Sequence, residues 1–211
     1  MSRASIQNRH FLLRRLHSLF GLIPVGAFLL FHLWENSQSR FGASHYNEQV
    51  YGWLQSINYL LVIEIFLIAL PLLFHALYGI VIIRTGRSDV VRYPYLHNTT
   101  YLLQRISGIG LLLFLLLHVG WTRLWGIWEP GVSRDLYIHM QTLLSHPVNF
   151  LLYLLGLLLA VFHLCNGLWS MAISWGVVTT PQAQRRLFKV AAFLALILMS
   201  VGVQGLWGFM P

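Results

Sequence analysis

Hydrophobic residues are concentrated in five long runs along the chain, and polar residues gather between them. The runs cover approximately Leu12–Trp34, Asn58–Ile83, Tyr101–Trp125, Pro147–Val178 and Leu187–Phe209. A helix needs about 20 residues to cross a hydrocarbon core about 30 Å thick, and each run is long enough. The pattern therefore predicts an all-α integral membrane bundle of five transmembrane helices, with residues 1–211 forming a single domain. The first run is too long for a cleaved signal peptide, and no small-residue cleavage site follows it.

The composition supports a membrane location and excludes several classes of protein. Hydrophobic residues make up 57% of the chain and charged residues 9%, whereas soluble proteins have about 25% charged residues. Such a chain could not cover itself with polar surface in water, which excludes an ordinary soluble enzyme. Cys165 is the only cysteine, so a disulfide scaffold and a cysteine-bound iron–sulfur centre are excluded. The sequence also lacks a glycine-rich fingerprint for a flavin or nucleotide.

The net charge of +8 would suit nucleic-acid binding, but the distribution of the basic residues favours a topological explanation. Eleven of the fourteen fall on one side of the predicted membrane: Arg3, Arg9, Arg14, Arg15, Arg84, Arg87, Arg92, Arg105, Arg185, Arg186 and Lys189. Only Arg40, Arg123 and Arg134 fall on the other side. By the positive-inside rule we expect a cytoplasmic N-terminus, an external C-terminus and no nucleic-acid partner.

Each of the first four runs carries one histidine within its apolar part: His32, His75, His118 and His163. A polar side chain at membrane depth is costly and indicates a function, although a neutral imidazole can simply link two helices by a hydrogen bond. The depths favour a function, because His32 and His118 (the outer pair) lie towards the outside and His75 and His163 (the inner pair) towards the cytoplasm. Two imidazoles facing each other at one level suit a six-coordinate haem iron. We therefore expect four helices to enclose two stacked haems.

Small residues occur where a porphyrin would need space. The residue eleven positions before each histidine is three helical turns away, at the level of the other histidine pair. This residue is Gly21 on the first helix, Glu64 on the second and Ser107 on the third. Gly79 and Gly167 follow the inner pair by about one turn. Glycine is common at membrane helix contacts, so each glycine alone is a weak indication of haem packing. Zinc, the competing metal, would need ligands that converge on one point, which two separate levels do not provide.

Cationic and hydroxyl side chains gather at the cytoplasmic ends of the first and third runs. They are Arg14, Arg15, His17, Ser18, Arg105 and Ser107. Haem propionates need such partners, so we expect these residues to contact the propionates or edge of the inner haem.

Three stretches resemble the cytochrome b membrane-anchor subunit of succinate dehydrogenase and fumarate reductase, in its five-helix, two-haem, single-polypeptide form. The first stretch runs from Arg14-Arg15-Leu16-His17-Ser18 to Gly21, the second from Glu64 to Gly79, and the third from Leu103-Gln104-Arg105 to Val119. The resemblance implies that the four histidines ligate two haems b in a bacterial cell membrane. It also implies a flavoprotein with FAD and an iron–sulfur subunit on the cytoplasmic face. Electrons would pass between these partners and a quinone, for which menaquinone fits better than ubiquinone.

Glu64 is the only acidic residue well inside a predicted span. It is either an interfacial carboxylate bonded to a neighbour or a proton handler at a quinone site beside the outer haem. We expect the second.

Two other functions share these features. A haem b anchor of another quinone-linked enzyme, such as a hydrogenase or formate dehydrogenase, would carry the same histidines and differ in its partner subunits. A proton-coupled transporter would use the histidines and Glu64 without haem, and would be colourless.

Overall fold

The computed structural model describes residues 3–86, 89–124 and 135–210, with side chains from residue 8 onward. Arg87, Trp125 and Arg134, which entered the predictions above, lie outside the described residues, as does the side chain of Arg3. Every regular element within the described ranges is a helix, and they contain no strand. The all-α fold class is therefore confirmed.

Among the described residues, five helical segments are long and apolar enough to cross a membrane, as predicted. They are Asn8–Phe41, Leu60–Thr85, Leu96–Thr122, Pro147–Ser174 and Pro181–Gly208. The first segment continues several residues beyond the predicted end at Trp34, so that its last turns include polar side chains.

Prolines divide the first two spans into shorter helices. The first span consists of α1 (Arg3–Leu22), α2 (Pro24–Ser37) and the 3₁₀ turn η1 (Gln38–Phe41). Pro24 stands at the first position of α2, where its missing N–H is not needed. The second span consists of α5 (Leu60–Ile63), the π-helical turn η3 (Glu64–Ala69) and α6 (Leu70–Thr85). Pro71 cannot donate to the preceding turn, so the hydrogen-bond ladder widens immediately before it.

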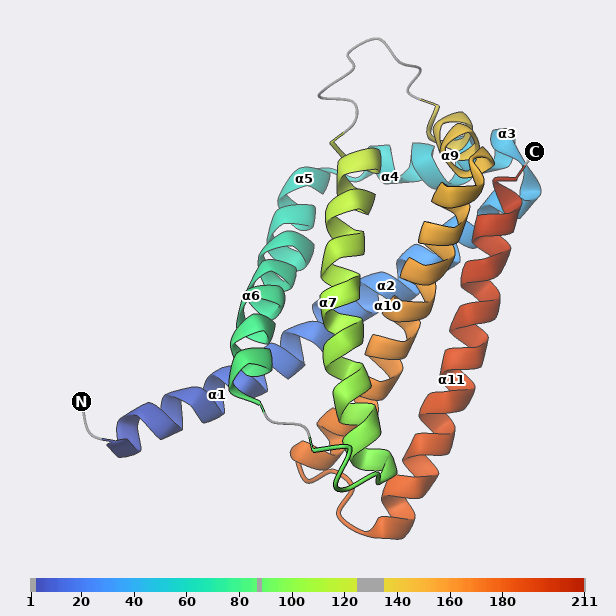
Figure 1. Ribbon diagram of the computed structural model, residues 1–211. Coiled ribbons are helices and arrows are strands. Elements are labelled where there is room, and N and C mark those ends of the chain that lie inside the picture. The colour runs from blue at the N-terminus through green and yellow to red at the C-terminus, as the bar shows by residue number, and fades with distance from the viewer. Residues whose placement is uncertain (1–2, 87–88, 125–134, 211) are drawn as a thin grey trace. The chain divides into compact units, whose positions relative to one another are not determined.

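The last three spans are the single helices α7 (Leu96–Thr122), α10 (Pro147–Ser174) and α11 (Pro181–Gly208) (Figure 1). α10 ends in a Schellman motif, in which Gly176 adopts a left-handed φ of 75°. The Gly176 N–H donates to Ile173 and the Val177 N–H to Ala172, which satisfies carbonyls that the helix end would leave unpaired. The shorter described elements are α3 (Ala43–His45), η2 (Tyr46–Tyr51), α4 (Gly52–Ser56) and α9 (Leu136–Ser145).

The chain divides into two compact units. Unit 1 comprises Met1–Phe28, Leu61–Gly108 and Phe162–Ala192, and in it α1 packs against α6 (Figure 1). Unit 2 comprises Leu29–Leu60, Ile109–Val161 and Phe193–Pro211. Its core is a buried cluster of Tyr46, Val50, Tyr137, Met140, Leu144, Tyr153 and Phe209. The inner pair belongs to unit 1 and the outer pair to unit 2. The single-domain organisation remains a prediction.

Candidate functional site

The inner pair lies face to edge within unit 1. His75 comes from α6 and His163 from α10, and their ring centroids are 6.0 Å apart with the planes at 89°. In a metal site with two axial imidazoles, each metal–nitrogen bond is about 2 Å long and each nitrogen lies about 1 Å from the centre of its ring. The two ring centres are therefore about 6 Å apart. The spacing of the two rings thus fits a six-coordinate haem iron between them.

Hydrogen bonds at Nδ1 orient both inner rings. His75 Nδ1–H donates to the His17 carbonyl oxygen over 2.8 Å. Ser107 Oγ lies 3.1 Å from His163 Nδ1 and donates its own hydrogen to the Gln104 carbonyl oxygen, so it accepts from the imidazole. A proton held on Nδ1 leaves Nε2 as the nitrogen that can ligate a metal. Both inner histidines therefore have the tautomer that an axial ligand needs.

A polar network holds α10 against α7 beside His163. The Gln104 side-chain amide donates to the His163 carbonyl oxygen over 3.0 Å, and Asn166, only 8% exposed, donates to Gln104 Oε1 over 2.6 Å and to Thr100. Neither Gln104 nor Asn166 was predicted from the sequence as a site residue. Their positions carried a usable signal, because each lies three residues from a predicted site residue and so on the same helix face.

Two glycines allow the inner rings to approach neighbouring helices. A Cβ atom at Gly21 of α1 would overlap the His75 ring, and one at Gly108 of α7 would lie 3.0 Å from His163 Cε1. Gly21 was predicted from its spacing, whereas Gly108 was not predicted. Each glycine opens space for one inner imidazole.

The two glycines that follow the inner pair lie in similarly close contacts. A Cβ at Gly79 would be 3.2 Å from His17 Cε1, and one at Gly167 would be 3.2 Å from Gln104 Nε2. These positions are tight but do not touch the ligand rings. Gly79 lets His17, whose carbonyl oxygen accepts from His75, lie close to α6. Gly167 lets Gln104, which donates to the His163 carbonyl oxygen, lie close to α10.

Among the predicted propionate contacts, His17 and Arg105 have buried nitrogens without hydrogen-bond partners in the described part of the chain. The His17 ring stacks on His75, with centroids 4.0 Å apart and planes at 6°, and its Nδ1 has no partner. Arg105 donates to the Ile83 carbonyl oxygen and lies 5.7 Å from the Tyr101 ring centre, while its Nε has no partner. Both nitrogens could donate to a carboxylate that entered unit 1.

The other predicted propionate contacts make different interactions. The Arg15 guanidinium lies over the Phe11 and Trp175 rings at 4.7 and 4.9 Å. Ser18 accepts from Trp175 Nε1 over 3.1 Å and donates to the Arg15 carbonyl oxygen. Arg14 lines a surface groove between α1 and α6. None of these three side chains has a hydrogen bond or ring contact with an inner imidazole among the described residues. Arg15 and Ser18, which stand on either side of His17 in α1, both contact Trp175.

The outer pair has a similar geometry within unit 2. His32 of α2 and His118 of α7 have ring centroids 5.8 Å apart and planes at 72°. His118 Nδ1 lies 3.3 Å from the Tyr153 hydroxyl, and Phe114 stacks on the His118 ring at 5.5 Å. The ring spacing again fits two axial ligands of one iron.

Glu35 is a buried acid beside the outer pair that the sequence analysis missed. It is 5% exposed, its Oε2 lies 4.0 Å from His32 Nδ1, and its Oε1 has no hydrogen-bond partner among the described residues. The expectation that Glu64 is the only acidic residue inside a span was therefore wrong, because the first span continues to Phe41. The three-residue spacing from His32 would have placed Glu35 on the histidine face.

Two further polar residues complete the surroundings of His32. Asn36 Nδ2 donates to the His32 carbonyl oxygen over 2.7 Å and lies 3.3 Å from His32 Nδ1. Burial, together with the nearby Glu35 carboxylate, raises the pKa of Tyr46. The Tyr46 hydroxyl therefore keeps its proton and donates to Asn36 Oδ1 over 3.4 Å.

Glu64 is the first residue of η3 and is half-buried. It belongs to unit 1, whereas His32 and His118 belong to unit 2. Its role near the outer haem remains a prediction.

No group of three or more His, Cys, Asp or Glu side chains converges to hold a metal ion anywhere in the part of the chain that the structure describes. Each histidine pair offers two ligands. An iron bound by a pair would take its remaining four ligands from a porphyrin.

The fold and these sites define an all-helical membrane protein with two histidine pairs, each spaced for the axial positions of one iron. The family model described as "Succinate dehydrogenase/Fumarate reductase transmembrane subunit" matches residues 87–202. The succinate dehydrogenase cytochrome b558 subunit of Bacillus subtilis (strain 168) is 39% identical over 202 residues, which cover 96% of this chain and 98% of that protein. The chain therefore belongs to the family of membrane cytochrome b subunits of succinate dehydrogenase and fumarate reductase, which confirms the resemblance in its motifs. A hydrogenase or formate dehydrogenase anchor and a haem-free transporter are not supported.

Proposed function

We propose that the chain is a dihaem membrane anchor that carries electrons between an iron–sulfur subunit and a membrane quinone. The observation that carries the proposal is the pair of imidazoles in each unit, with centroids 6.0 and 5.8 Å apart. Haem b bound in each unit would supply one-electron redox chemistry. Dicarboxylate chemistry would take place on a partner flavoprotein carrying FAD. The name of the Bacillus subtilis relative, a cytochrome b558 subunit, supports haem b as the group.

In this proposal the protein residues ligate, orient and enclose the two haems. His75 and His163 ligate the inner haem, and His32 and His118 the outer one. The His17 carbonyl and the Ser107 hydroxyl keep the inner imidazoles in the tautomer with Nδ1 protonated. Such partners typically change metal affinity by 10–100-fold.

We further propose that His17 and Arg105 donate to the propionates of the inner haem. An unpaired buried donor costs about 1–3 kcal/mol. Arg105 Nε is such a donor, and His17 Nδ1 is one in the tautomer that protonates it. A propionate carboxylate accepts several hydrogen bonds and would remove that cost. Arg15 and Ser18 would then hold the helix on either side of His17 through Trp175.

Replacing single ligands tests the two-haem assignment. Wild type should contain two haems per chain by the pyridine haemochrome assay. His75→Ala and His32→Ala should each lose one haem, and the part of the absorption spectrum that is lost should differ between the two variants. His146→Ala, an exposed histidine after α9, should keep both. One haem per wild-type chain, or full haem content in both ligand variants, would contradict the assignment.

For quinone, we propose that Glu64 handles the coupled proton and that menaquinone is preferred to ubiquinone. Glu64→Gln keeps the shape of the side chain but cannot titrate, so quinone-linked turnover should fall at least tenfold, or about 1.4 kcal/mol in the barrier, with haem content unchanged. Glu35→Gln is the matched comparison, because it removes the other carboxylate found in the first two spans. Unchanged turnover in Glu64→Gln would return Glu64 to the role of an interfacial carboxylate.

We also propose that the N-terminus lies in the cytoplasm of a bacterial cell and the C-terminus outside. Support comes from the eleven basic residues on one side of the spans, which the positive-inside rule places in the cytoplasm. The flavoprotein and iron–sulfur partners would bind on this basic side.

A further inference from the structure

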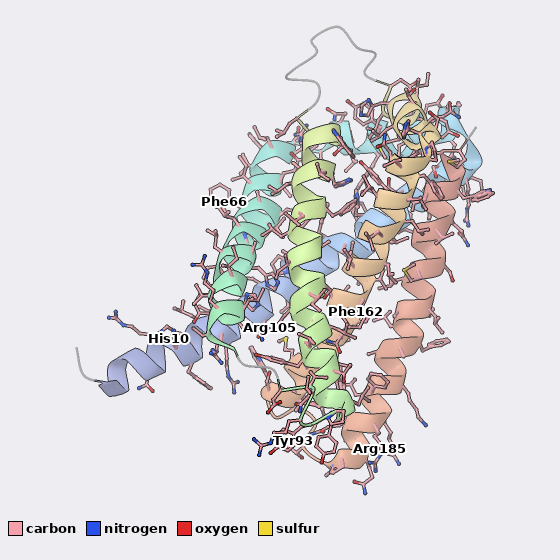
Figure 2. The ribbon with its side chains drawn as sticks, viewed as in Figure 1. His10, Phe66, Tyr93, Arg105, Phe162 and Arg185 are labelled. Carbon is pink, nitrogen blue, oxygen red and sulfur yellow. The ribbon has the colours of Figure 1, made fainter. Side chains whose placement is uncertain are left out.

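An open groove runs between α1 and α6 on the surface of unit 1, at the basic side of the spans. It has a volume of about 380 Å³ and is lined by His10, Phe11 and Arg14 of α1 and by Tyr78, Val81, Ile82 and Thr85 of α6. Figure 2 shows His10 on α1 beside the end of α6. None of these residues ligates a haem in the proposal above.

Of the polar side chains that line the groove, Arg14 is the one without a hydrogen-bond partner among the described residues. The Thr85 hydroxyl donates to the Val81 carbonyl oxygen over 2.9 Å. The Tyr78 hydroxyl lies 3.3 Å from His10 Nδ1 and donates to the His10 carbonyl oxygen. Arg14 is exposed, and none of the described residues accepts a hydrogen bond from it. The groove therefore presents a cation with five N–H donors and no acceptor.

Unit 1 does not supply a carboxylate that could neutralise this arginine. Its two acidic residues are Glu64 and Asp89. Glu64 lies at the opposite end of the second span, and Asp89 accepts from the Arg92 backbone N–H. The same unit carries the eleven basic residues of the basic side. An anion that pairs with Arg14 must therefore come from outside unit 1.

An exposed apolar stripe leads from the groove along one face of the second span. Its members recur every three or four residues and are Phe66, Leu70, Leu73, Leu77 and Val81, with exposures of 63, 48, 54, 58 and 40%. Figure 2 shows Phe66 projecting outward from its helix. Such spacing forms a continuous face, long enough to accompany an acyl chain into the hydrocarbon core.

We propose that this groove binds an anionic phospholipid, with the headgroup phosphate on Arg14 and an acyl chain along the stripe. Basic pockets between membrane helices on the cytoplasmic side are suited to such headgroups, and arginine pairs with phosphate through two parallel hydrogen bonds. Phosphatidylglycerol presents a net negative charge to Arg14. Phosphatidylcholine carries a quaternary ammonium that offsets its phosphate, so the site selects the anionic lipid.

Native mass spectrometry of the delipidated complex, titrated with phosphatidylglycerol or phosphatidylcholine, tests this site. Wild type should bind phosphatidylglycerol with a Kd at least tenfold lower than that for phosphatidylcholine. Arg14→Gln should abolish the preference, while Arg14→Lys should keep part of it. Val81→Trp, which fills the groove without changing its charge, should also abolish binding. Arg92→Gln, an exposed arginine of the same unit outside the groove, is the control and should bind as wild type does.

Three results would overturn the proposal. The first is equal affinity of wild type for the two lipids, and the second is an unchanged preference in Arg14→Gln. The third is displacement of the lipid by millimolar inorganic phosphate, which would indicate a site for soluble anions. Haem absorbance is recorded for each variant. Loss of haem in Arg14→Gln with lipid binding retained would assign Arg14 to a propionate instead.

Discussion

At the scale of single residues, the groups that neighbour Nδ1 differ among the four histidines. His75 donates to a carbonyl oxygen, His163 to a hydroxyl, and His118 lies within reach of the Tyr153 hydroxyl. The carbonyl and the serine hydroxyl are uncharged acceptors, so they fix the tautomers of His75 and His163 without drawing the proton away from Nδ1. His32 differs, because a buried carboxylate lies 4.0 Å from its Nδ1.

The Ser107 hydroxyl provides a test of this orienting role. Ser107→Ala removes the acceptor of His163 Nδ1–H and should weaken binding of the inner haem by about 10–100-fold, with the outer haem unaffected. The measurement is haem retention on dilution of the purified protein, followed by absorbance. Ser170→Ala is the matched control, because Ser170 also lies on the His163 helix and its hydroxyl donates only to the Gly167 carbonyl oxygen. Equal haem retention in the two variants would show that Ser107 merely packs.

The sequence predicted the four histidines because imidazoles at membrane depth are rare and costly. It did not predict what holds them. Tyr153, Gln104 and Asn166 reach their partners across helices, and such contacts depend on how the helices are rotated. Ser107 was expected to leave space for a porphyrin and to contact its propionates or edge, whereas its hydroxyl lies 3.1 Å from His163 Nδ1 and accepts a hydrogen bond from it.

At the scale of helices, hydropathy predicted how many spans there are but not where each one ends. Helix ends depend on prolines, caps and local packing. Thus Pro24 divides the first span into α1 and α2, and the segment then continues to Phe41. Glu35 was overlooked for this reason, since the apolar run stops at Trp34. The π-helical turn before Pro71 also has no hydropathy signal.

Glycines on α1 and α7 allow a test of close packing at this scale. Gly21→Ala places a methyl group where the His75 ring lies, so it should displace the imidazole and reduce inner haem content by at least half. Gly120→Ala on α7 meets open space and should raise helix stability by about 0.5–1 kcal/mol. Haem content and thermal unfolding monitored by absorbance measure both effects. The close-packing argument fails if Gly21→Ala behaves like Gly120→Ala.

At the scale of the whole molecule, the sequence lacks the motifs that would hold a flavin or an iron–sulfur cluster. It carries no flavin fingerprint, and its one cysteine cannot hold an iron–sulfur cluster. Family membership supplies the remaining context, since the matching family belongs to succinate dehydrogenase and fumarate reductase. A membrane subunit of this kind must present a surface to its partners, and its charge is concentrated on one side.

The start of α11 is the part of that surface we expect to bind the partners. Arg185, Arg186 and Lys189 are exposed there (Figure 2 labels Arg185), and three adjacent cations without an acid between them would attract an acidic protein face. Replacing all three with glutamine should lower the flavoprotein and iron–sulfur protein recovered with the tagged chain from mild detergent by at least fivefold.

The same experiment separates docking from folding. Haem content of the triple variant should equal that of wild type, because none of the three residues contacts an imidazole in the described hydrogen bonds and ring contacts. Arg123→Gln, directly after the C-terminal end of α7, should leave partner recovery unchanged. Wild-type recovery should also fall as salt rises, since exposed charges are screened over about 8 Å at physiological ionic strength. If the triple variant instead recovers both partners as wild type does, the docking surface lies elsewhere on the basic side and hydrophobic contacts dominate it.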